Sequence, residues 1–230
     1  MNQLLAIVPH FPSFRESADG QGNYLTQIIP EVAKKVPVEI IALRFGDQDV
    51  TESGVGWTVT RIDPPTPLKD VFALYLPEYL DGAIDALHRA ALQKANSYAS
   101  RPPIWCHGYE TGSIVEVLTQ QGFKVVAVPH YSVGVETLHD LALGDDPIRE
   151  NAFDSPWATA IGKRTPVRLR PMGVRWASRL GRVGRSLPLP TAIQTQFLKL
   201  DLERKMVANA SRLVAVGPSF ETELNAVYPC

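Results

Sequence analysis

Three of the five histidines stand at the ends of short apolar runs that predict buried strands. They are His10, His107 and His130. The carboxyl ends of parallel strands meet at one edge of a sheet, so we expect these side chains at a common rim. A neutral imidazole both donates and accepts hydrogen bonds, which suits it to holding hydroxyl groups. Each histidine alone is equally compatible with a loop residue bonded to backbone. Glu110, close to His107, polarises a hydroxyl, orients that histidine or is a solvated acid at a helix start.

Strands and helices alternate along the chain. Runs of apolar residues predict strands at 3–9, 38–43, 57–62, 104–107, 125–129 and 213–216, with a loop rich in Gly and Asp between the second and third. Helical spacing predicts helices at about 24–36, 113–121, 133–143, 195–210 and 219–227. Residues 68–99 are predicted to form either one long helix or a pair broken near Pro77. This alternation predicts a doubly wound α/β fold, with a mostly parallel sheet and helices on both faces.

Length and composition indicate one folded unit. The chain has 230 residues, of which 45% are hydrophobic and 20% charged, so we expect residues 1–230 to form a single domain. No apolar run approaches the roughly 20 residues that cross a bilayer, and the start lacks the features of a signal peptide. We therefore expect a cytoplasmic location. The two cysteines predict neither a disulfide framework nor a metal site.

Several common functions lack their motifs. The sequence contains no P-loop, no Gly-x-Gly-x-x-Gly after the first strand and no Gly-x-Ser-x-Gly elbow. A formal net charge of −1, without a recognised reading motif, argues against nucleic acid as a partner. Ordinary nucleotide-binding enzymes and serine hydrolases are disfavoured.

Four elements, in the right order, resemble the retaining GT-B glycosyltransferases of family GT4, especially the sucrose-synthase and sucrose-phosphate-synthase branch. The residues that carry the resemblance are Asp19-Gly20-Gln21-Gly22-Asn23-Tyr24, His107-Gly108-Tyr109, His130-Tyr131-Ser132-Val133-Gly134, and Glu203-Arg204-Lys205 with the segment 208–216. Asp19 stands where that branch has its first glycine. The most extended match is the last one.

The resemblance implies a fold, an activity and a set of site residues. The fold is the Rossmann-like N-terminal half of a GT-B enzyme. The activity is transfer of a sugar from a nucleotide sugar to an acceptor hydroxyl with retention of configuration, with no cofactor beyond that co-substrate and no metal. By carry-over, His130 is the catalytic residue beside the reacting sugar. The substrate-binding residues implied are Gly20, Gln21, His107, Tyr109 and Ser132.

In that family a second domain holds most of the nucleotide sugar, and here it would begin beyond Tyr228-Pro229. We expect this chain to lack the donor-binding domain and to be inactive alone. Three alternatives stay open. The chain is the acceptor-binding part of a longer enzyme, one subunit of a split transferase with a separate donor-domain chain, or a non-catalytic module that binds a sugar or a partner.

A basic insertion is predicted at about residues 155–190. Between Ser155 and Leu200 there are nine cations and no acidic residue. Apolar residues interleaved from Val174 to Val183 predict a short amphipathic element, as at a membrane surface. Arg168, Arg170 and Arg175 are the candidate anion-binding residues. The cations would meet an anionic lipid surface, making the protein membrane-peripheral, or a phosphorylated or acidic acceptor, or an acidic partner such as the donor domain. A solvated loop is the alternative.

Overall fold

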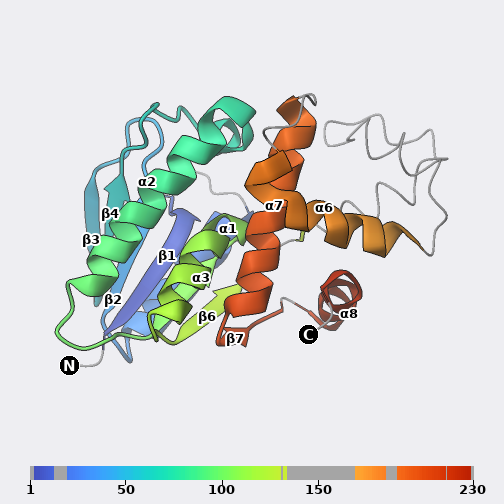
Figure 1. Ribbon diagram of the computed structural model, residues 1–230. Helices are drawn as coiled ribbons and strands as arrows, with labels where there is room; N and C mark the ends of the chain where they lie inside the picture. Colours follow the sequence, from blue (N-terminus) through green and yellow to red (C-terminus); the bar gives the residue numbers. More distant parts are fainter. Residues whose placement is uncertain are drawn as a thin grey trace.

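A seven-stranded sheet forms the centre of the protein (Figure 1). The computed structural model describes residues 3–12, 20–130, 132–133, 169–184, 191–215 and 217–228. The sheet order is β3-β4-β2-β1-β5-β6-β7, and every pairing is parallel except that of β3 with β4. The strands are β1 (Leu4–His10), β2 (Val38–Leu43), β3 (Thr51–Gly54), β4 (Trp57–Ile62), β5 (Ile104–His107), β6 (Val125–Val128) and β7 (Arg212–Leu213).

Helices cover both faces of this sheet (Figure 1). The helical elements are α1 (Gly20–Ala33), η1 (Val71–Tyr75), α2 (Pro77–Asn96), η2 (Tyr109–Thr111), α3 (Gly112–Gln120), α6 (Arg170–Gly184), α7 (Thr191–Asn209) and α8 (Pro218–Val227). One core cluster joins α1 to the sheet through Leu25 and Ile29, whereas α2, α3 and α7 contribute to the cluster on the other face. The central strand β1 is buried on both sides, which explains its nearly continuous apolar sequence.

The strand order reverses between β1 and β5. From β1 the chain adds β2 and β4 on one side, and then returns to place β5, β6 and β7 on the other. In open sheets of this kind, ligands bind in the crevice outside the carboxyl ends of the strands at such a switch point. The ends of β1 and β5 therefore mark where a site is expected.

The predicted fold class is confirmed by this sheet and its two helical layers. Of the two arrangements predicted for residues 68–99, the broken pair is confirmed, because η1 ends just before Pro77 and α2 starts at it. Helix α1 continues through Pro30, which lies in its last turn. Residues 134–143 of the predicted helix at 133–143 lie outside the described residues. No helix in the described part of the chain is long and apolar enough to cross a membrane.

The prediction of a simple loop between residues 43 and 57 is wrong, because it contains β3, which pairs antiparallel with β4. The side chain of Arg61 in β4 is almost fully buried and holds this edge in place. Its guanidinium donates to the Asp49 carbonyl over 3.0 Å and to the Glu52 carboxylate over 2.7 Å. β3 has four residues and only intermediate or exposed positions, so no apolar alternation signals it.

Candidate functional site

His107 and His130 meet at the carboxyl ends of β5 and β6. Nδ1 of His107 lies 2.8 Å from Nε2 of His130, and the two rings stack with centroids 5.1 Å apart. His107 is completely buried, whereas His130 is half-buried. Burial lowers the pKa of the His107 imidazole well below its ordinary value of 6.5, and the neighbouring His130 lowers it further. His107 is therefore neutral at physiological pH, and in the hydrogen bond between the rings one imidazole donates while the other accepts.

Two aromatic rings pack against this pair. The Tyr24 ring lies with its centroid 5.1 Å from that of His130 and 5.9 Å from that of His107. The ring centroid of Trp105 in β5 lies 4.4 Å from that of His107. Tyr24 is 39% exposed, so it forms the outer wall of the pair. Rings of this kind present flat apolar surfaces against which a sugar ring can pack.

Gln21 of α1 and Glu110 lie close to Gly108, the residue that follows His107 in the turn after β5. Gly108 has a φ of +75°, and a Cβ there would lie 2.3 Å from Oε2 of Glu110 and 3.5 Å from Nε2 of Gln21. Any larger residue would therefore clash with the Glu110 carboxylate. Glu110 is 1% exposed, so the interpretation of this residue as a solvated acid is wrong. Nε2 of Gln21 is buried and has no hydrogen-bond partner among the residues that the structure describes.

A buried carboxylate, Glu203 of α7, holds the segment that follows His130. The Val133 backbone N–H donates to Glu203 Oε1 over 2.8 Å, and the Tyr228 hydroxyl donates to Oε2 over 2.8 Å. Burial raises the pKa of Tyr228 well above 10, and the Glu203 carboxylate raises it further. Glu203 itself is fully buried. It therefore ties the loop after β6 to the C-terminal helix α8.

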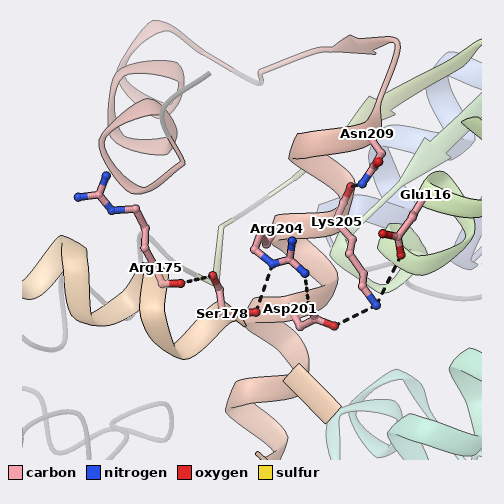
Figure 2. Close-up of polar contacts among 7 residues, drawn as sticks. All are labelled: Glu116, Arg175, Ser178, Asp201, Arg204, Lys205 and Asn209. Atoms are coloured by element: carbon pink, nitrogen blue, oxygen red, sulfur yellow. Dashed lines mark hydrogen bonds and ion pairs between the residues drawn. The ribbon is translucent and has the colours of Figure 1, made fainter. Parts of the chain in front are cut away.

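Polar contacts also join α6, α7 and α3 (Figure 2). Arg204 donates to the Ser178 carbonyl over 3.3 Å and to Asp201 over 2.6 Å. Lys205 lies 3.1 Å from Asp201 and 3.6 Å from Glu116 of α3. These contacts fix α6 against α7. They also place Arg175, Arg179 and Arg204 around an open pocket of about 620 Å³, whose other lining residues are Ser178, Val207, Ala208, Val227 and Tyr228.

The structure places the remaining predicted residues as follows. Gly20 begins α1, and Ser132 is buried in the segment that Glu203 holds. Tyr109 lies fully buried in the main core rather than at the rim. His10 lies at the end of β1 and packs edge-on against Phe45, with ring centroids 5.1 Å apart. Arg170 begins α6, Arg175 lines the pocket beside α7, and Arg168 lies outside the described residues.

Sequence reasoning missed the contributions of Tyr24 and Glu203 to this site. Tyr24 fitted the apolar pattern of a helix, and although it belongs to the segment 19–24 that carries the family resemblance, it was not among the predicted site residues. Glu203 was noted as part of a Glu-Arg pair, but its burial depends on α7 packing close to α3. Gly112 at the start of α3 permits that approach, because a Cβ there would lie 1.8 Å from the Leu202 carbonyl oxygen. Among the described residues, no group of three His, Cys, Asp or Glu side chains is placed to hold a metal ion.

The fold is similar to that of GT-B glycosyltransferase domains. Sucrose-phosphate synthase from Thermosynechococcus elongatus matches over 100% of this chain and 46% of its own, with 17% sequence identity and a TM-score of 0.56. A Medicago truncatula protein solved in complex with UDP-glucose matches over 99% of this chain and 49% of its own, with 13% identity and a TM-score of 0.47.

No family model and no curated protein matches the sequence. The likeness to the synthase confirms the predicted glycosyltransferase fold, whereas membership of GT4 stays a prediction. The chain spans about half of the length of these matching structures, at 46% and 49%.

Proposed function

We propose that this chain is the acceptor-binding domain of a retaining, GT4-like glycosyltransferase, which moves a sugar from a nucleotide sugar to an acceptor hydroxyl. The observation that supports it best is the hydrogen-bonded pair His107 and His130 at the carboxyl ends of β5 and β6, with the Tyr24 ring beside the pair and Gln21 close to Gly108. This is the crevice in which open α/β sheets bind their ligands.

The groups at this rim are suited to sugar hydroxyls. His130 is half-buried, and its ring is held by His107, so it presents a fixed polar edge to a ligand. The amide nitrogen of Gln21 is a buried donor without a partner in the described part of the chain. Tyr24 supplies a ring for packing against the sugar. We assign His130 to contact with the reacting sugar and His107 to positioning His130.

The neutral state of His107 determines the charge that this ring places near a bound sugar. Because burial lowers the pKa of His107 well below 6.5, the pair carries no fixed positive charge from this ring at physiological pH. Retaining transfer passes through an oxocarbenium-like sugar while the diphosphate leaves, so catalysis depends on alignment and on stabilising charge. A neutral His107 therefore adds no charge that would repel the positive sugar. The leaving diphosphate would be stabilised by the donor-binding domain.

The nucleotide sugar is a co-substrate in this proposal. The proposed enzyme joins this chain to a second α/β domain, either within a longer polypeptide or as a separate subunit. Without that domain we expect no transfer. The alternative is a non-catalytic module in which the same rim holds a sugar or a partner.

The first test is an assay of sugar-nucleotide hydrolysis and transfer, with this chain alone and joined to candidate donor domains. We expect activity only in the combination. His130→Ala should lower transfer by about a hundredfold, as removal of one preorganised hydrogen-bonding group does elsewhere. His10→Gln is the matched control, because His10 lies at the same sheet edge but packs against Phe45. It should keep the activity.

Sugar binding by the chain alone separates the two functions. If a sugar binds and His130→Ala abolishes that binding, but no donor domain yields transfer, the chain is a binding module. If His130→Ala leaves both binding and transfer unchanged in the completed enzyme, the site assignment is wrong.

A further inference from the structure

Helix α6 has two opposite apolar faces, and only one of them is buried. Val174 and Ala177 pack into the core, and Ser178 lies beside them at the contact with α7. Leu169 just before the helix, with Met172 and Trp176, lies at spacings of three and four residues and thus on one outward side. Their exposed fractions are 41%, 58% and 65%. We call these three residues the α6 strip.

The α6 strip is a local concentration of exposed apolar surface. Eight large apolar side chains are exposed among the described residues, and three of them belong to this strip. Contiguous exposed apolar residues mark surfaces that contact a partner or a membrane, whereas scattered ones need no explanation. An indole 65% exposed beside a methionine is therefore a candidate contact surface.

The charge around the strip is positive. Helix α6 itself carries four arginines, and no acid occurs between Ser155 and Leu200. Arg175 and Arg179 flank the strip and also line the pocket of about 620 Å³ together with Arg204. Among the described residues that line this pocket, none is acidic. Guanidinium groups hold phosphate oxygens through paired, charge-assisted hydrogen bonds, so the pocket suits a phosphate-bearing group.

We propose that α6 docks this protein onto an anionic phospholipid surface. The strip would enter the boundary between headgroups and acyl chains, while Arg175 and Arg179 hold headgroup phosphates. A single helix with bulky apolar residues on one side and cations beside them is what such docking needs. A stable protein interface uses about 20–30 residues a side, far more than this strip supplies. The proposal is independent of the proposed sugar transfer.

The net charge of the whole chain does not favour binding to an anionic surface. With a formal net charge of −1, the chain as a whole has no attraction for an anionic surface. Binding therefore has to come from the local cations and the strip, and it should disappear when either is removed.

Co-sedimentation of the full 230-residue chain with lipid vesicles tests this. We expect binding to vesicles of equal parts phosphatidylcholine and phosphatidylglycerol, and little binding to phosphatidylcholine alone. Arg175→Gln with Arg179→Gln should weaken the partition about thirtyfold, given the usual contribution of a cation near an anionic membrane. Trp176→Ser should weaken it about tenfold through lost apolar contact. Because Trp176 is 65% exposed, this second variant is expected to fold normally.

Matched controls exist elsewhere on the chain. Val55→Ser removes an apolar side chain that is 94% exposed, in the turn between β3 and β4. Lys35→Gln with Lys69→Gln removes the same amount of positive charge from other exposed positions. Both controls should bind vesicles like the parent chain.

Three results would overturn the proposal. The first is equal binding to both kinds of vesicle. The second is retention of binding in Trp176→Ser. The third is complete displacement by inorganic phosphate at the phosphate concentration of the lipid, which would assign the pocket to a free anion instead.

Discussion

The rim at the end of β5 and the outer side of α6 use polar residues in opposite ways. At the rim, His107 is buried and neutral, and its ring is held by a hydrogen bond of 2.8 Å. On α6, Arg179 is exposed and lies beside Trp176, which is 65% exposed. Buried polar groups act through fixed geometry, because each lost partner costs free energy directly. Exposed cations are screened by salt, so each contributes little and binding to an anionic surface needs several of them together.

Glu203 links the two regions through its hydrogen bonds, so its substitution is expected to have the largest effect on stability. It accepts a hydrogen bond from the backbone N–H of Val133, which follows His130, and another from Tyr228. Tyr228 lines the pocket of about 620 Å³ that also contains Arg175 and Arg179. Glu203→Gln leaves an amide that cannot accept both hydrogen bonds, so one buried donor loses its partner. We expect the free energy of unfolding to fall by about 2 kcal/mol. Chemical denaturation at neutral pH measures this.

A mutant cycle with Tyr228→Phe sharpens the result. If Glu203 and Tyr228 act together, the tyrosine substitution should cost less stability in the Glu203→Gln background than in the parent chain. Glu116→Gln, a partly exposed acid on α3, is the matched control and should change stability little. Equal costs in both backgrounds would contradict the coupling.

The neutral state of His107 gives a pH dependence that the arginines of α6 cannot give. Its pKa is lower in the folded state than its ordinary value of 6.5, so below pH 6.5 the unfolded chain binds a proton that the folded chain does not. The stability contributed by neutral His107 is therefore present above pH 6.5 and is lost as pH falls. The loss is at most about 1.4 kcal/mol per pH unit.

Stability measured against pH for His107→Gln tests this sign. The stability difference between the parent chain and the variant should shrink as pH falls below 6.5. Arg179→Gln is the control, because an arginine stays protonated throughout this range and its effect should not vary there. Parallel curves for the parent chain and His107→Gln would show that His107 titrates alike when folded and unfolded.

The smallest effect is expected from the partly exposed ion pairs beside the pocket. Lys205 is 22% exposed and contacts Asp201 and Glu116 over 3.1 and 3.6 Å (Figure 2). Lys205→Gln should lower the free energy of unfolding by about 0.5 kcal/mol in low salt and by less in high salt. Denaturation at two salt concentrations measures both. A loss as large as that for Glu203→Gln would mean that exposure is a poor guide to these contributions.

Most of the sheet follows from local pattern. Buried strands such as Val38–Leu43 and Ile104–His107 are mostly apolar runs, and their ends match the predicted ends. β3 was missed because an exposed edge strand is held by its partner and by the distant Arg61, not by its own sequence. For the site, the sequence predicted which strand ends carry histidines, but it could not predict that His10 packs against Phe45 while His107 meets His130.

The sequence by itself determined the alternation of strands and helices, the histidines at the strand ends and the cationic segment before Leu200, because each of these is a property of neighbouring residues. Only the tertiary structure decided that His107 is buried against His130, that Glu203 is a fully buried acceptor and that Trp176 faces outward while Val174 faces the core. Burial and pairing depend on which distant elements pack together. A single carboxylate or indole in the sequence carries no information about that packing.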